Sequence, residues 1–265
     1  MTENSEGLQH ISKSLPKLQS QTKQVGEVEP EIVCKICGDY GWIHPLREDG
    51  HIDYSDIARC ECKVESDKQH KRKALLKKCG LPYATKDRTF DNFIIDKRFP
   101  ILAEAKEAAM SLAEGTAGFN WLILKGKVDI GKSHLAIAIC RRWLERGVPA
   151  IYTLVPATMD NLRSGFDLEG EESYRRQLQF LKDVELLVLD DLGAGKVTEW
   201  AVEKLMIIID HRSNEGLPLV VTTNKDLNKL PFDDEHRIAS RLLRYPKAKH
   251  VIMDNVSEYR LRRDL

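Results

Sequence analysis

The residues with the clearest chemical potential form a glycine-rich loop between an aliphatic run and a helical pattern. The loop fits the eight-residue pattern G-x-x-x-x-G-K-[ST], in which backbone N–H groups surround the phosphates of a nucleotide. The residues that we expect to contact the nucleotide are Gly126, Lys127, Val128, Asp129, Ile130, Gly131, Lys132, Ser133 and His134. Lys132 would reach the β and γ phosphates, and Ser133 would bind magnesium. The alternative is a chance Gly-Lys-Ser turn.

Paired acids follow a later aliphatic run. Asp190 and Asp191 come directly after residues 184–189. A buried strand that ends in two carboxylates needs a counterion, so we expect Asp190 to bind magnesium and Asp191 to orient or deprotonate the attacking water. Alternatively, both acids cap a turn. Asn224 follows another strand pattern, 219–222, and we expect it to hold that water unless it only forms a turn.

A row of arginines follows at helical spacing. Arg237, Arg241 and Arg244 are four and three residues apart, which places them on one face of a helix. Most such rows are solvated faces. A guanidinium supplied across a subunit boundary would instead stabilise the charge that develops on a transferred phosphoryl group.

Four cysteines gather in a segment too poor in aliphatic residues to build a core of its own. Cys34 and Cys37 have the C-x-x-C spacing of a zinc knuckle, and Cys60 and Cys62 form a tighter pair after 22 intervening residues. We expect the four thiolates to hold a structural zinc ion. Two histidines between the pairs could replace one sulfur. A redox role for the first pair lacks the βαβ pattern that usually surrounds it.

The elements that must position these residues follow an α/β pattern. Short aliphatic runs alternate with helical patterns, the runs at 121–124, 150–154, 186–189 and 219–222 and the helices at 134–146 and 199–214. Such alternation predicts a parallel sheet that is flanked by helices on both faces. Thr198 suits the N-cap of the second helix, and Gly216 follows its end.

Composition divides the 265 residues into four predicted parts. These are a flexible tail (1–30), a zinc-binding module (31–63), a basic helical linker (64–88) and the α/β domain (89–265). Nine basic and three acidic side chains between positions 63 and 88 give the linker region a charge of +6. The whole chain has 41 basic and 41 acidic residues, so contact with nucleic acid would depend on local patches.

The sequence contains no run of the ~18 to 20 apolar residues that a membrane helix needs, and no secretory-type apolar run among its first residues. We therefore expect a cytoplasmic protein without membrane contact. Because thiols stay reduced in that compartment, metal binding is favoured over disulfides for the cysteines.

From about residue 80 onward, the chain resembles the DnaC and DnaI type loaders of replicative helicases and the related IstB transposition helpers, within the AAA+ ATPases. The matching segments are 80–82 with 89–93, 131–136, 189–193, 222–224 and 237–242. The resemblance implies Walker A, Walker B, sensor 1 and box VII roles for the last four. It places Arg241 at the position of the family's arginine finger, which acts on a neighbouring subunit, with Arg237 as the second candidate. The pair Tyr259-Arg260 also resembles the end of many relatives.

The resemblance implies a P-loop AAA+ core that binds ATP and magnesium, hydrolyses ATP and forms a homo-oligomer when ATP binds. The cysteine segment resembles the N-terminal zinc module of DnaI-like loaders, which contacts the helicase. We therefore expect a protein that loads a hexameric replicative helicase onto single-stranded DNA during replication. The alternatives are an IstB-like transposition helper and a nucleotide-gated DNA-binding adaptor with negligible hydrolysis.

Two departures from the family pattern bear on turnover. Asp129 stands where the loop of the family usually has a third glycine, so its side chain would crowd the phosphates or slow hydrolysis. Only 24 residues follow Arg241, too few for a three-helix lid, so we expect the lid to be absent or vestigial.

The family also touches single-stranded DNA between Walker A and Walker B, where this chain has 159–166, Tyr174, Arg175 and Arg176. A solvated helix is the alternative there.

Overall fold

The computed structural model describes residues 34–48, 50–195, 198–230 and 236–259. The chain divides into two compact units, Met1–Lys63 and Val64–Leu265. The predicted tail, residues 1–30, and Arg260 lie outside the described residues.

The described part of the first unit has turns around its cysteines and one short antiparallel ladder. The ladder pairs β1 (Trp42–Ile43) with β2 (Ala58–Arg59). Among the described residues of this unit, the buried apolar side chains are Cys37 and Cys60, while large side chains such as Tyr40 are exposed. A unit without an aliphatic core needs another source of stability, and its buried sulfur atoms are the candidates.

Helix α1 (Glu61–Lys78) accounts for the helical part of the predicted linker. The chain then passes through Cys79, which is buried in the core of the second unit, and a short 3-10 turn, η1 (Tyr83–Thr85). The residues between α1 and the α/β domain are therefore packed against that domain rather than helical throughout.

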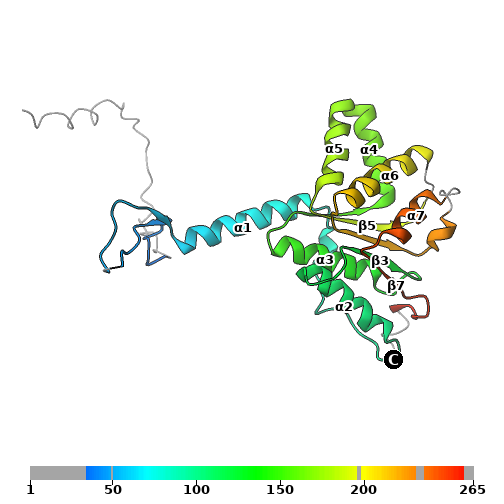
Figure 1. Ribbon diagram of the computed structural model, residues 1–265, viewed down its shortest axis with the longest axis horizontal. Helices are drawn as coiled ribbons and strands as arrows, with labels where there is room; N and C mark the ends of the chain where they lie inside the picture. The colour runs from blue at the N-terminus through cyan, green and yellow to red at the C-terminus, as the bar shows by residue number, and fades with distance from the viewer. Residues whose placement is uncertain (1–33, 49, 196–197, 231–235, 260–265) are drawn as a thin grey trace, which may run out of the picture. The chain divides into compact units, whose positions relative to one another are not determined.

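The second unit is built on a parallel sheet (Figure 1). The strand order of this sheet is β4-β5-β6-β3-β7. Its strands are β3 (Trp121–Lys125), β4 (Ala150–Leu154), β5 (Leu186–Leu192), β6 (Leu219–Thr223) and β7 (Ala248–Ile252). The first four agree with the predicted runs. Sequence analysis misses β7, because this edge strand is mostly half-buried and contains lysine and histidine instead of a continuous aliphatic run.

Helices cover both faces of the sheet (Figure 1). One face carries α2 (Ile101–Glu114) and α3 (Lys132–Glu145); the other carries α4 (Val155–Glu169), α5 (Glu171–Asp183), α6 (Glu199–Asn214) and α7 (Arg237–Arg244). Alternate side chains of each strand enter the two cores: on β3, Leu122 belongs to one core and Ile123 to the other. The predicted α/β class, a parallel sheet flanked by helices, is confirmed.

Helix α6 starts as its sequence predicts and ends in an unexpected buried cation. The Thr198 side chain accepts a hydrogen bond from the N–H of Ala201 at the start of the helix. Near its end, Arg212 is fully buried, and burial lowers the pKa of its guanidinium to about 10, so the group remains charged at neutral pH.

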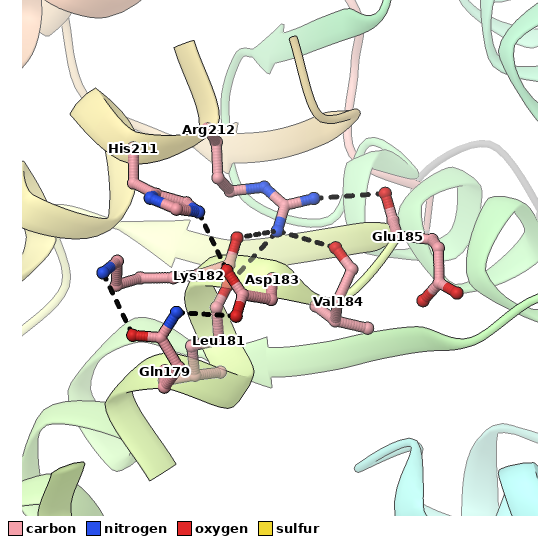
Figure 2. Close-up of polar contacts among 8 residues, drawn as sticks. All are labelled: Gln179, Leu181, Lys182, Asp183, Val184, Glu185, His211 and Arg212. Carbon is pink, nitrogen blue, oxygen red and sulfur yellow. Dashed lines mark hydrogen bonds and ion pairs between the residues drawn. The ribbon is translucent and has the colours of Figure 1, made fainter. Parts of the chain in front are cut away.

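The guanidinium of Arg212 joins three elements (Figure 2). It donates hydrogen bonds to the backbone carbonyls of Leu181, Lys182, Val184 and Glu185. It also donates to the carbonyl of Pro218. The carbonyls at the end of α5 have no partner within their helix and favour a positive charge. The arginine therefore fixes the end of α5 to the residues that precede β5 and β6.

Among the described helices, none is both long and apolar enough to cross a membrane.

Candidate functional site

A cavity of about 390 Å³ lies beside the glycine loop. The loop and the first turn of α3 form one wall with residues 128–134, all of which were expected at the site. The remaining lining residues are Arg88, Asn92, Phe93, Ile94 and Tyr259. Sequence analysis gives these no role, although the segment 89–93 and the Tyr259-Arg260 pair both contribute to the family resemblance. Gly126 and Lys127 lie outside the lining and shape the loop.

Two glycines are required by the path of the loop. Gly126 and Gly131 have φ values of +156° and +108°. A Cβ atom on Gly126 would lie 2.5 Å from the Ile130 side chain, and one on Gly131 would lie 2.6 Å from the ring of Phe93. Asp129 also has a positive φ, +59°, in the left-handed region that aspartate tolerates better than most residues. The loop therefore keeps a glycine-like backbone at Asp129 without a glycine.

Lys132 begins α3 and is buried beside the cavity, with 8% of its surface exposed. Its ammonium donates a hydrogen bond of 2.6 Å to the carbonyl of Lys127. Burial lowers the pKa of this ammonium, and the carboxylates of Asp191, Asp190 and Asp254 oppose that shift. A buried ammonium in the wall of an open cavity provides the positive charge that a phosphate group needs.

The two predicted magnesium ligands meet in the structure. Ser133 Oγ donates a hydrogen bond of 3.0 Å to Oδ1 of Asp190, whose side chain is almost fully buried. Thr222 donates to the same oxygen, and the hydroxyl of Tyr152 donates to Oδ2. Burial raises the pKa of Tyr152, so its hydroxyl stays protonated. Hydroxyl and carboxylate oxygens are the ligands that magnesium prefers, so this set fits the ion.

Asp191 lies in a β-bulge of β5. Leu189 pairs with Val221 and Leu192 with Thr223, so Asp190 and Asp191 together face the single residue Thr222. Asp191 has a φ of +59°, and its N–H donates to the hydroxyl of Thr222 at 2.9 Å. Bulges of this kind often redirect side chains next to functional sites. Here the bulge leaves Asp190 buried and Asp191 half-buried.

Asn224 follows the end of β6, between the strand that leads into the glycine loop and the strand that carries the acids. Its side-chain oxygen is buried and has no hydrogen-bond partner among the described residues. Buried polar atoms without a partner are rare in folded proteins. The orphaned oxygen fits the expected contact with a water molecule at the carboxyl ends of the strands.

His134 lines the cavity, but its ring is engaged by the segment before α2. Its Nε2 donates a hydrogen bond of 2.7 Å to the carbonyl of Thr89, and the ring meets Phe93 edge-on at 5.5 Å between centroids. Burial lowers the pKa of His134, which favours the neutral ring. His134 therefore holds the segment 89–93 beside the glycine loop.

The candidate finger arginines lie on α7, outside the residues that line the cavity. Arg241 forms an ion pair with Asp210 of α6 and donates to the carbonyl of Arg237 at 2.9 Å. About a third of its side chain (32%) is exposed. Within one chain the structure does not bring Arg241 to the cavity, and a role on a neighbouring subunit stays a prediction.

The predicted zinc ligands form one cluster. The sulfur atoms of Cys34, Cys37, Cys60 and Cys62 all lie within 4.8 Å of one another. The Cys34–Cys60 sulfur distance is 3.8 Å, and the Cys37–Cys62 distance is 3.3 Å. Four sulfurs bound tetrahedrally at roughly 2.3 Å from zinc lie about 3.8 Å apart, so the donor set fits this ion. A histidine in place of a sulfur is not needed, and His44 instead bonds the carbonyl of Asp56 at 2.8 Å.

The electrostatics of the cluster also favour a cation. The backbone N–H of Cys37 is the main cause that lowers the pKa of Cys34 to about 7. The contact with the Cys37 thiol, and then burial, raise the pKa of Cys62. The thiols thus compete for ionisation, and four thiolates at this separation require a positive ion between them.

The segment expected to touch DNA forms the helices α4 and α5. Arg175 lies 2.5 Å from Glu171 and Arg176 lies 3.9 Å from Glu172, and both arginines are exposed. Tyr174 lies against Trp200 of α6, with ring centroids 6.3 Å apart. Exposed ion pairs of this kind suit a solvated helix as well as a DNA-binding face, so the contact with DNA stays a prediction. The side chain of Phe166 lies outside the described residues.

The order of the strands places the glycine loop, Asn224 and the acid pair along one edge of the sheet, since the carboxyl ends of parallel strands lie together. This arrangement is that of a P-loop nucleotide-binding fold. The chain belongs to the IstB-like ATP binding protein family, whose model matches residues 70–265.

Individual relatives carry the names of helicase loaders. The replicative helicase loader DnaC of Escherichia coli K12 is 30% identical over 158 residues, which are 58% of this chain and 62% of DnaC. The loader DnaI of Bacillus subtilis is 25% identical over 225 residues, which are 81% of this chain and 69% of DnaI. A crystal structure of the DnaC helicase loader covers 65% of this chain and 100% of its own at 21% identity, with a TM-score of 0.53. The sequence match to DnaC of Escherichia coli K12 thus spans less than two thirds of the length of that relative.

Proposed function

We propose that the protein is an ATP-dependent loader that places a replicative DNA helicase on single-stranded DNA during replication. The hydrogen bond between Ser133 and Asp190 carries the ATP-binding half of this proposal, because it joins the two expected magnesium ligands. Relatives named as replicative helicase loaders support the choice of partner. A cytoplasmic location accompanies this function.

In this proposal each residue of the site has one task. Backbone N–H groups of the loop surround the phosphates, and Lys132 exchanges its bond with the Lys127 carbonyl for phosphate oxygens. Ser133 and Asp190 hold magnesium, which neutralises phosphate charge when bound. Asn224 holds the attacking water, and Asp191 orients this water and accepts its proton.

The nucleoside is proposed to lie on the apolar side of the cavity. Phe93 and Ile94 before α2 and Tyr259 after β7 provide that surface, and Asn92 offers donors and an acceptor. Tyr259 is anchored to the loop by its backbone N–H, which donates to the carbonyl of Asp129 at 2.6 Å. The nucleoside pocket therefore combines segments from both ends of the α/β domain.

The remaining parts of the chain are proposed to bind partner molecules. The domain 89–265 binds ATP and forms a homo-oligomer, in which Arg241, or Arg237 as the second candidate, reaches the ATP of a neighbouring chain. The zinc module, residues 31–63, contacts the hexameric helicase and is followed by the basic linker 64–88. Ile36, Tyr40, Leu46 and Tyr54 are exposed on that module and offer apolar surface to a partner.

A pull-down with the hexameric replicative helicase of the host tests the proposal. We expect the full chain with ATP and magnesium to retain the helicase, and a matched chain that begins at Val64, the start of the second compact unit, to lose it. Failure of the full chain to bind any helicase, together with stable binding of duplex DNA, would contradict the loader function.

Such a result would favour an IstB-like transposition helper. This second candidate is supported by the description of the matching family and by its range, which begins at residue 70 and leaves out the four cysteines. A third candidate, an adaptor that binds ATP with negligible hydrolysis, is supported by Asp129 in the loop. Phosphate release no faster than that of a Lys132→Ala variant, with single-stranded DNA present, would favour the adaptor.

A further inference from the structure

Tyr152 of β4 connects the expected magnesium ligand with the chain that follows α1. The tyrosine is buried in the core between the sheet and helices α2 and α3, and its hydroxyl donates to Oδ2 of Asp190 at 2.5 Å. Ser133 and Thr222 both donate to the other oxygen, Oδ1. Tyr152 is therefore the donor that holds the second carboxylate oxygen among the described residues.

These three hydroxyls come from three different elements, which fixes the plane of the carboxylate. Ser133 belongs to α3, Thr222 to β6 and Tyr152 to β4. Rotation of the Asp190 carboxylate out of this plane would break all three hydrogen bonds. The bond from Tyr152 thus keeps Oδ1 directed at Ser133, the orientation in which both residues can bind one magnesium ion.

The main chain of Tyr152 makes a second pair of contacts at the edge of the sheet. Its N–H donates to the carbonyl of Cys79 at 2.8 Å. Its own carbonyl lies so close to Gly80 that a Cβ atom on this glycine would be 2.2 Å from the carbonyl oxygen, and Gly80 has a φ of +73°. Cys79 and Gly80 directly follow α1. The chain that leaves α1 is therefore fixed to the residue that holds Asp190.

We propose that Tyr152 is a positioning residue for magnesium–nucleotide binding: its hydroxyl orients the Asp190 carboxylate, and its main chain transmits to Asp190 the position of the Cys79–Gly80 junction. This inference rests on the proposed ATP-binding function. A displacement of the junction then changes the magnesium dependence of nucleotide binding, although neither Tyr152 nor the junction lines the nucleotide cavity. The nucleotide site is in this way sensitive to the chain that precedes the α/β domain.

The variant Tyr152→Phe tests the first half of the inference, because it removes the hydroxyl and keeps the ring. Binding of a fluorescent ATP analogue to the full chain is measured over a range of magnesium concentrations and in EDTA. We expect the half-saturating magnesium concentration to rise roughly tenfold or more, the usual effect of losing a group that supports a metal ligand. Binding in EDTA should change little. A merely structural role would weaken binding equally with and without magnesium.

The matched control is Tyr245→Phe. Tyr245 stacks on Trp121, with ring centroids 4.0 Å apart, and belongs to the core on the opposite face of the sheet. We expect this variant to keep the magnesium dependence of the wild type. If Tyr152→Phe stays within twofold of the wild type, the inference is wrong. A wild-type chain that binds no nucleotide at any magnesium concentration overturns the proposed function as well, so the two failures are distinguishable.

A double-mutant cycle tests the second half. Gly80→Ala forces a Cβ atom against the Tyr152 carbonyl, and we expect it to raise the half-saturating magnesium concentration in the wild-type background. In the Tyr152→Phe background it should cause no further rise, because a displaced Tyr152 main chain acts on Asp190 through the hydroxyl, which this variant lacks. Effects that multiply in the double variant would refute transmission through Tyr152. If Gly80→Ala fails to fold, Leu81→Ala takes its place, because it loosens the packing of the next residue against the core without placing a Cβ atom on the Tyr152 carbonyl.

Discussion

Ser133 and Asp190 are 57 residues apart in the sequence, and the hydroxyl of Ser133 donates a hydrogen bond of 3.0 Å to the carboxylate of Asp190. The contact joins the first turn of α3 to the end of β5, so both expected magnesium ligands stand in place within a single chain. In the proposed binding of nucleotide and magnesium, the ion takes the place of this hydrogen bond, and phosphate oxygens take the place of the Lys127 carbonyl at Lys132.

Removal of the Ser133 hydroxyl is expected to affect magnesium-dependent activity far more than stability. Ser133→Ala should lower ATP hydrolysis at least tenfold and reduce the free energy of unfolding by only about 1 kcal/mol. Phosphate release over a range of magnesium concentrations, together with denaturant unfolding, measures both effects. Ser111→Ala is the matched control, since the Ser111 hydroxyl bonds the carbonyl of Ala108 within α2. Wild-type turnover in Ser133→Ala would contradict the assigned role.

Substitutions at Asp129 distinguish the effect of its charge on ATP affinity from the effect of its backbone conformation. Asp129→Asn removes the charge, keeps the size and also tolerates the φ of +59°. We expect ATP affinity to rise about fivefold, because repulsion between a carboxylate and a phosphate some 4 Å away in water costs about 1 kcal/mol. Asp129→Gly should give a similar gain. A gain in Asp129→Gly alone, measured by calorimetric titration of magnesium ATP, would assign the effect to the backbone instead.

The glycine loop, the acid pair and the cysteine cluster were predictable because each depends on residue types at short spacing. Their positions also follow from sequence, since parallel strands bring Ser133, Asp190 and Asn224 to the same edge of the sheet. The cysteine pairs are a similar case: two short motifs suffice to identify four ligands that meet.

The supporting hydrogen bonds could not be predicted in the same way. A tyrosine in an aliphatic run, such as Tyr152, is typical of any core strand, and its contact with Asp190 depends on strand order, which periodicity does not reveal. The bulge at Asp191 has no glycine to mark it. Arg212 resembles any charged residue at the end of a helix, and its complete burial follows from the way α5 and β6 meet around it. These features result from tertiary packing.

Metal removal is expected to unfold the cysteine module. The purified chain should contain one zinc ion per molecule, and chelation should expose residues 34–60 to protease, because Cys37 and Cys60 are the buried apolar side chains of its described part. Cys37→Ser should lose the metal, whereas Cys140→Ala, in the α/β core, should retain it. Metal analysis and limited proteolysis measure both outcomes. A metal-free preparation in which this segment still resists protease would contradict the zinc assignment.

A mixing experiment tests the expected role of Arg241 on a neighbouring subunit. Lys132→Ala and Arg241→Ala should each abolish most ATP hydrolysis, and a mixture of the two should recover part of it, since some interfaces then combine an intact loop with an intact arginine. Asp210→Asn is the control: it removes the ion pair that Arg241 forms within its own chain and should leave hydrolysis active. No recovery in the mixture, when each variant still forms oligomers, would argue against a shared site.

Burial of His250 on β7 predicts a loss of stability at mildly acidic pH. Its Nε2 is buried without a hydrogen-bond partner among the described residues, and burial lowers the pKa of the ring below its ordinary value of 6.5, against the opposing hydrogen bond to the Leu242 carbonyl. The folded protein then binds fewer protons than the unfolded chain, so the free energy of unfolding decreases as the pH falls below 6.5. His134, whose pKa is lowered by burial as well, adds to this decrease.

Thermal unfolding is measured between pH 7.5 and pH 5.5, because an ordinary histidine titrates over roughly this range. In His250→Gln we expect a smaller decrease in melting temperature across this range than in the wild type, because one of the two half-buried rings with a lowered pKa is gone. His70→Gln, at an exposed position on α1, should follow the wild type. Comparison of the variants removes contributions that all of them share, such as proton uptake by the cysteine cluster. If the melting temperatures of His250→Gln and the wild type differ by the same amount at every pH, His250 stabilises the fold by packing alone, and its protonation is not linked to unfolding.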